Sequence, residues 1–160
     1  MKWVFPILFL SIVSVSAQKV IPAAELKTLK GKKVNLTDYI EEGKVTIINF
    51  WATWCGPCKK ELDALAPIYP EWEEKYGVKF LAVTVDDSRG FPKVKPMVKE
   101  KDWPYIVLSD VNQEMMRKLN FFRIPQMYIV DGDGAIKHSI TGYIPGSEAD
   151  LESKIAALSK

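Results

Sequence analysis

The sequence predicts an α/β domain in which helices cover both faces of a central mixed β-sheet. Residues 45–51 and 78–85 form almost continuous apolar runs, which are typical of strands buried on both faces. Helical segments are expected between such strands, and strands that alternate with helices usually lie in one sheet. Near the C-terminus, the turn signal at 131–134 separates two more strand-like runs and predicts an antiparallel hairpin.

The first half of the chain is expected to alternate between strands and one long helix. The expected elements are a strand at 33–36, a strand at 45–51, a helix at 56–76 and a strand at 78–85. Pro67 and Pro70 lie inside this helix. Because proline lacks the backbone donor and clashes with the preceding turn, we expect a kink or an interruption there.

The second half continues the alternation and ends in a hairpin and a helix. The expected elements are a loop at 86–89, a helix at 93–101 that begins near Pro92, a strand at 105–108, a helix at 111–119, strands at 126–130 and 135–141, and an amphipathic helix at 147–158. Ser147 is a candidate N-cap of the last helix. Phe121 and Phe122 are expected in the core, and His138 on the surface.

Residues 1–17 have the three parts of a secretory signal peptide. Lys2 supplies the positive end, residues 3–15 form an apolar run without a charge, and residues 15–17 have small side chains suited to cleavage. The run is shorter than the roughly 20 apolar residues of a membrane span. We expect residues 18–160 to form one periplasmic or secreted domain, which would be membrane-anchored if the first segment were retained.

Charge and composition exclude several classes of partner. The formal net charge is +2, and it falls to +1 when Lys2 leaves with the signal. A nearly neutral chain lacks the basic surface that nucleic acids require, so we expect no nucleic-acid partner. Two cysteines and one histidine are too few for the four ligands of structural zinc, and we expect neither a metal nor a cofactor.

The most informative motif is Trp54-Cys55-Gly56-Pro57-Cys58, which contains both cysteines of the chain. It lies between an expected strand and an expected helix, where unpaired N–H groups and the helix dipole favour a thiolate. A structural role is weakly supported, because a disulfide that closes so short a loop contributes little stability. The motif therefore predicts a redox-active dithiol.

Residues 50–61 resemble the active-site segment of the thioredoxin superfamily. The signal, the early strand and an additional segment at 86–103 are similar to the envelope thioredoxins of the TlpA/ResA type, and the resemblance covers residues 18–160. It implies a thioredoxin fold, with Cys55 as the exposed nucleophile and Cys58 as the buried resolving thiol. Trp54 and Pro57 flank the sulfurs and are candidates for substrate binding, although hydrophobic cover is the simpler role of Trp54.

The second implied element is Ile124-Pro125. In the resembling fold this proline follows a cis peptide bond and lies beside the cysteines, and the Ile124 backbone could pair with an extended substrate strand. An ordinary trans proline that opens a strand is the alternative.

The third implied element is an acidic group. Thioredoxins usually carry a buried Asp where this chain has Asn49, which cannot titrate. ResA-like enzymes instead carry a Glu three residues after the second cysteine, and Glu61 matches that position. The resemblance implies that Glu61 exchanges the proton of Cys58, while a solvated Glu favoured by the helix dipole is the alternative.

Together these features predict an exported thiol–disulfide oxidoreductase that reduces or exchanges the disulfides of exported proteins. Gly56-Pro57 resembles the spacer of reducing thioredoxins, and the resemblance implies a membrane electron donor and a role in cytochrome c maturation. We expect a monomer. Two alternatives stay open: a redox-inert binding or chaperone module, and a peroxiredoxin-like peroxidase. The Thr-x-x-Cys pattern of the latter is absent, because Ala52 lies three residues before Cys55.

Overall fold

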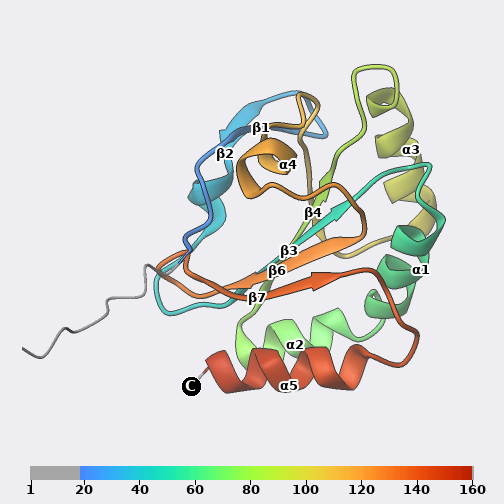
Figure 1. Ribbon diagram of the computed structural model, residues 1–160. Coiled ribbons are helices and arrows are strands. Elements are labelled where there is room, and N and C mark those ends of the chain that lie inside the picture. The colour runs from blue at the N-terminus through green and yellow to red at the C-terminus, as the bar shows by residue number, and fades with distance from the viewer. Residues whose placement is uncertain (1–18, 160) are drawn as a thin grey trace, which may run out of the picture.

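The computed structural model describes residues 19–159, which build one seven-stranded sheet in the order β2-β1-β5-β4-β3-β6-β7 (Figure 1). The expected signal at 1–17 lies outside the described residues. The strands are β1 (Glu25–Thr28), β2 (Lys33–Asn35), β3 (Thr46–Trp51), β4 (Lys79–Thr84), β5 (Ile106–Ser109), β6 (Gln126–Val130) and β7 (Ile136–Thr141). The helices are η1 (Leu36–Tyr39, 3-10), α1 (Gly56–Leu65), α2 (Tyr69–Tyr76), α3 (Phe91–Lys101), α4 (Glu114–Leu119) and α5 (Glu148–Leu158).

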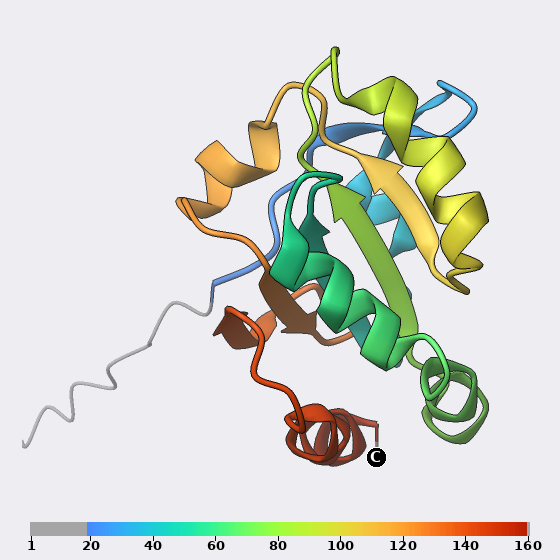
Figure 2. The same ribbon diagram turned by 90° about the vertical axis from the view of Figure 1, so that its right-hand side faces the viewer.

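The sheet is mixed, as predicted. β3, β4 and β5 are parallel neighbours, while β1, β6 and β7 pair antiparallel. Figures 1 and 2 show α1, α2, α3 and α5 on one side of the sheet and α4 on the other. Every residue of β3 is buried, which explains the unbroken apolar run that predicted this strand.

The long helix expected at 56–76 is two helices. α1 ends at Leu65 and α2 begins at Tyr69, and Pro67 lies in the connection between them. Pro70 does not interrupt α2 but lies in its first turn, where the missing N–H is not needed. Gly77 then ends α2 in the left-handed conformation, with φ of 64°.

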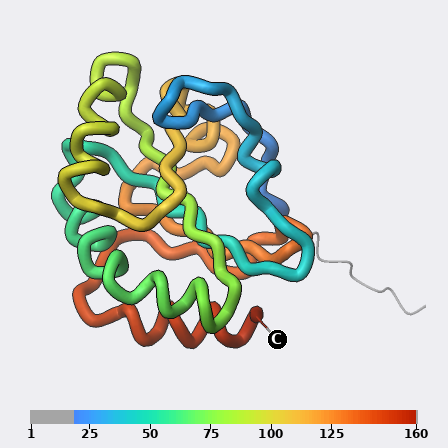
Figure 3. The backbone as a smooth tube through the Cα atoms, turned by 180° about the vertical axis from the view of Figure 1, so that it is seen from behind, coloured from blue at the N-terminus to red at the C-terminus, as the bar shows by residue number. Residues whose placement is uncertain are grey.

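The sequence did not predict β1 or the pairing of the first described residues. Leu26 is the only fully buried side chain among the four residues of β1, so the strand lacks a recognisable apolar pattern. Val20 forms an isolated antiparallel bridge with Ala135. Figure 3 shows this amino-terminal segment beside the hairpin of β6 and β7. The segment therefore extends the sheet beyond the start of β7.

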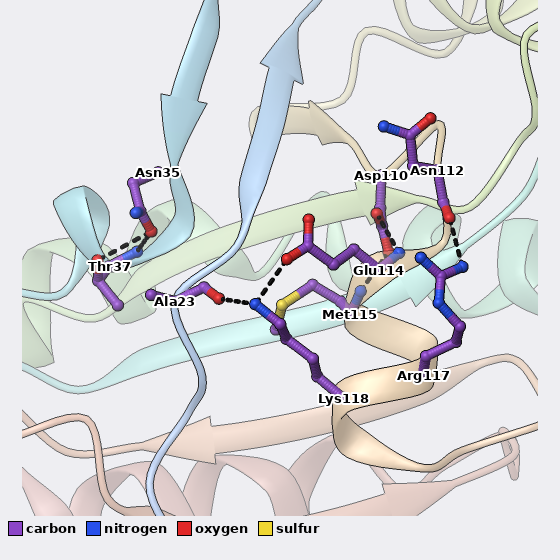
Figure 4. A network of polar contacts seen from close by, with 9 residues as sticks. All are labelled: Ala23, Asn35, Thr37, Asp110, Asn112, Glu114, Met115, Arg117 and Lys118. Atoms are coloured by element: carbon purple, nitrogen blue, oxygen red, sulfur yellow. Dashed lines mark hydrogen bonds and ion pairs between the residues drawn. The ribbon is translucent and has the colours of Figure 1, made fainter.

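Helix α4 is held in place by side chains at its amino end and along its length, as Figure 4 shows. Asp110 is 1% exposed and accepts hydrogen bonds from the N–H groups of Glu114 and Met115, each at 2.8 Å. Burial raises the pKa of this carboxyl. Lys118 Nζ donates to the carbonyl oxygen of Ala23 at 2.6 Å and pairs with Glu114. These contacts fix the start of α4 and tie the helix to the segment that precedes β1.

Two of the smaller expectations need correction. Phe121 is buried and packs against Phe50 with ring centroids 4.7 Å apart, but Phe122 is 83% exposed. Only one of the two adjacent rings therefore enters the core. His138 is partly buried in β7 rather than fully on the surface. Ser147 occupies the N-cap position of α5, but its side chain makes no capping hydrogen bond.

No helix within residues 19–159 has both the length and the apolar character to cross a membrane.

Candidate active site

The two cysteines form a disulfide at the point where the chain passes from β3 into α1. Cys55 is the N-cap residue of α1, and its Cα lies 5.3 Å from that of Cys58. The N–H group of Cys58 donates a hydrogen bond to Cys55 Sγ at 3.3 Å. An N–H group at a helix start stabilises negative charge, so the same geometry would favour a Cys55 thiolate in the reduced protein.

The cysteines differ in exposure, although less than the sequence suggested. Cys58 is fully buried, as expected, but Cys55 is only 5% exposed and is therefore not the open thiol that we predicted. In the oxidised state its sulfur is bonded to Cys58 and lies against the Ile124 segment. Trp54 is 71% exposed, and Pro57 lies exposed in the first turn of α1.

The Ile124-Pro125 segment lies against the disulfide. The peptide bond is cis, as predicted, and the carbonyl oxygen of Ile124 lies 3.9 Å from Cys55 Sγ. A third segment reaches the same place, because the N–H group of Gly142 donates to the carbonyl oxygen of Pro125 at 2.8 Å. The site is thus formed by the start of α1, the start of β6 and the end of β7.

Glu61 lies on the buried side of α1, together with Cys58 and Leu62. It is 5% exposed, which excludes the alternative of a solvated first-turn glutamate. Burial raises the pKa of this carboxyl from 4.5 to about 7, while the hydrogen bond from Asn49 acts in the opposite direction. Glu61 therefore titrates near neutral pH.

Asn49 is the partner of Glu61, which the sequence did not reveal. Its Nδ2 donates to Glu61 Oε2 at 2.6 Å, across the interface between β3 and α1. Asn49 Oδ1 is buried and has no hydrogen-bond partner among the described residues. A primary amide offers a donor and an acceptor on one carbon, so rotation by 180° would let Oδ1 accept from a protonated Glu61. Asn49 can therefore serve both protonation states of the carboxyl.

Asp86 holds the loop that precedes the cysteines, and it was predicted only as part of a loop. Its carboxylate accepts from the N–H and the hydroxyl of Thr53, each at 2.8 Å, and from the hydroxyl of Thr84 at 2.6 Å. Asp86 is 2% exposed. These bonds join the end of β4 to the residue before Trp54. A carboxylate directly after an apolar strand was the available sequence signal.

The arrangement can carry thiol chemistry, and metal chemistry finds no support in the part of the chain that the structure describes. Within residues 19–159, no group of three or more His, Cys, Asp or Glu side chains is placed to hold an ion. Cys55, Cys58, Ile124 and Pro125 meet at one point, and Glu61 lies in the interior next to Asn49.

A family model matches residues 17–139, and its description is the AhpC/TSA family. The chain belongs to this family. The chain is also 35% identical over 114 residues to a thiol-disulfide oxidoreductase ResA of Bacillus thuringiensis subsp. konkukian, with 71% of this chain covered. The aligned part spans only 63% of that relative's length. A ResA of Geobacillus kaustophilus is 31% identical over 139 residues, which cover 86% of this chain and 75% of the relative.

A solved structure supports the same placement within the thioredoxin-like proteins. A thioredoxin-like protein of Porphyromonas gingivalis is 40% identical and superposes with a TM-score of 0.76, covering 87% of this chain and 91% of its own. The expected thioredoxin fold is therefore confirmed. The resemblance of residues 50–61 to the active-site segment of the thioredoxin superfamily was therefore a correct prediction from a short motif.

We predict that the disulfide-bonded protein loses stability as the pH rises from about 4.5 to 7. The pKa of Glu61 is higher in the folded protein, so its contribution is fully present below pH 4.5 and is lost as the carboxyl ionises near pH 7. The loss amounts to about 3 kcal/mol. Denaturant unfolding at several pH values would measure it, and the Glu61→Gln variant should show a flatter profile. The exposed Glu71→Gln control should keep the wild-type slope.

We also predict that Asn49→Leu raises the pKa of Glu61 further. The substitution has a similar volume but removes the amide hydrogen bond that lowers this pKa. A carbon-13 NMR titration of the glutamate carboxyl carbons would follow the change directly. Asn112→Leu, at an exposed position on the loop before α4, is the matched control. An unchanged Glu61 titration in Asn49→Leu would contradict the partnership.

Proposed function

We propose that this protein is an extracytoplasmic thiol–disulfide oxidoreductase that reduces or exchanges the disulfides of protein substrates. The observation that carries the proposal is the hydrogen bond from the Cys58 N–H to Cys55 Sγ at the start of α1. It supports a stabilised thiolate at Cys55, which is the reactive form of a cysteine. The ResA relatives are described as thiol-disulfide oxidoreductases, which supports the same class of reaction.

The reaction begins with the reduced dithiol. The Cys55 thiolate attacks one sulfur of the substrate disulfide, a Cys55–substrate bond forms, and the other substrate sulfur leaves as a thiolate. Cys58, deprotonated, then attacks Cys55 and displaces the first substrate sulfur. The substrate gains two electrons and, after protonation, two protons. The protein ends with the Cys55–Cys58 disulfide that the structure contains.

Glu61 accepts the proton of Cys58 in the second step. Cys58 is fully buried, so bulk water cannot easily remove its proton. Glu61 lies on the same buried side of α1, and its pKa of about 7 suits a group that takes up and releases a proton near neutral pH. Asn49 keeps the carboxyl oriented through both states.

The segment around Pro125 receives the substrate. An extended substrate chain would pair with the Ile124 backbone and present its disulfide to Cys55, whose Sγ lies 3.9 Å from the Ile124 carbonyl oxygen. Trp54 and Pro57 offer exposed apolar contacts on the other side of the cysteines. We assign Trp54, Pro57, Ile124 and Pro125 to substrate binding.

The cellular setting follows from the proposed export. Residues 1–17 act as the signal peptide, and an oxidising compartment would drain electrons from the dithiol, so a membrane electron donor must reduce it again. Exported proteins with cysteine pairs, including apocytochromes c, are the proposed substrates. We propose that the protein works as a monomer, and the two steps of the mechanism require no group from a second copy.

We predict distinct behaviour of the two cysteine variants. Cys55→Ser should abolish reduction of insulin disulfides, because the attacking sulfur is lost, whereas Cys58→Ser should accumulate a mixed disulfide that cannot be resolved. Turnover of insulin and mass spectrometry of the trapped species provide the measurements. Wild-type protein that reduces hydroperoxides but not insulin would support the peroxidase alternative. Inactivity with both substrates would support a binding module.

We predict that Glu61→Gln slows resolution while leaving the first attack nearly unchanged. Resolution should slow by about 100-fold, the lower end of what a positioned acid–base group contributes. Single-turnover kinetics with a chromogenic disulfide separate the attack from the release. Glu71→Gln serves again as the control. Equal slowing of both steps would mean that Glu61 is needed for the geometry of α1 and not for proton transfer.

A further inference from the structure

Four cations without an ion-pair partner among residues 19–159 lie next to the site, either beside its segments in the sequence or in the hollow beside Trp54. Lys59 and Lys60 follow Cys58 in the first turns of α1, Lys93 lies in α3, and Arg123 precedes Ile124. Lys60, Lys93 and Arg123 are exposed and Lys59 is partly exposed. None of the four pairs with a carboxylate among residues 19–159. We call these four residues the basic rim.

Three carboxylates close to the basic rim are neutralised or enclosed. Glu61 and Asp86 are buried, and Asp86 accepts three hydrogen bonds from neighbouring threonines. Asp87 is partly exposed, but its Oδ2 pairs with Arg89 at 3.0 Å. These three carboxylates therefore leave the positive charge of the basic rim unbalanced.

The surface as a whole is nearly balanced in charge. The net charge of the chain is only +2. Ion pairs are spread over the remaining surface, such as Lys33 with Glu25 and Lys118 with Glu114. Exposed acids without an ion pair, including Glu71 and Glu100, also occur there. Cations without an ion pair, such as Lys30 and Lys99, occur there as well, so the basic rim differs from them by its position next to the cysteine motif and the Ile124 segment.

A hollow of about 490 Å³ lies between Trp54 and α3, next to Lys93. Val85, Met97 and Gln113 are among its lining residues. Gly90 forms part of its wall, and a Cβ at that position would lie 2.6 Å from Asp86 Oδ1, so a larger residue would displace the carboxylate. The wall is therefore closely fitted, and the hollow offers room for substrate side chains beside the indole ring.

We propose that the basic rim binds an acidic polypeptide segment next to the disulfide of the substrate protein. The inference rests on the proposed oxidoreductase function and adds a selection rule to it. Lys93, which lines the hollow with Trp54, and Arg123, which precedes Ile124, would attract carboxylates that flank the substrate disulfide. Attraction of this kind raises the association rate and is screened by salt.

The test uses three peptides that contain the same disulfide ring. Glutamate residues flank the ring in the first peptide, lysine residues in the second, and neutral residues in the third. With reduced protein, kcat/KM for the acidic peptide should exceed that for the basic peptide roughly tenfold at low salt. The preference should largely disappear between about 10 mM and 300 mM salt, as the screening length falls.

A matched pair of double variants separates the basic rim from overall charge. Lys93→Glu with Arg123→Glu should reverse the preference, whereas Lys30→Glu with Lys99→Glu, which changes the net charge equally at exposed positions outside the rim, should retain it. Equal reduction of all three peptides by the wild-type protein would overturn the selection rule and leave the oxidoreductase function intact. Failure to reduce any peptide would overturn both. An identical response of the two double variants would overturn the assignment to the basic rim.

Discussion

The site depends on one constraint: the chain must leave the buried strand β3 and start α1 with its first N–H groups directed at Cys55. The hydrogen bond from the Cys58 N–H to Cys55 Sγ is the direct evidence for this geometry. Everything around it maintains the turn. Asp86 ties Thr53 to the end of β4, and the Ile124-Pro125 segment lies against Cys55 from the opposite side. A helix start can stabilise a thiolate only while the sulfur stays in place.

The same burial that secures the turn makes a proton acceptor necessary. Cys58 is sealed inside the domain, so its proton needs an internal acceptor. In the proposed mechanism Glu61 accepts this proton, although burial disfavours its charged form and raises its pKa to about 7. Asn49 compensates in part, since it donates a hydrogen bond without adding a second charge. A carboxylate at position 49 would instead repel ionised Glu61 at close range.

The sequence predicted features whose cause is local, and it missed most of those that depend on contacts between distant segments; the contact of Ile124-Pro125 with Cys55 was predicted only through the family resemblance. The apolar runs of β3 and β4 and the spacing of Cys55 and Cys58 are local signals, and they gave the sheet centre and the dithiol. The hydrogen bond between Asn49 and Glu61 joins a strand to a helix, so it cannot be predicted from the sequence around either residue alone. Phe122 was misplaced for a similar reason, because pattern alone does not say which of two adjacent aromatic rings enters the core.

The basic rim has two effects that differ in a measurable way. Positive charge near Cys55 favours its thiolate and so accelerates attack on every disulfide, whatever surrounds it. Recognition of acidic segments instead changes the relative rates for substrates that differ only in charge. Salt weakens both effects, but only the second alters the ratio between two substrates. Selection by charge therefore adds to the intrinsic reactivity of Cys55, and the two can evolve separately in proteins that share this dithiol.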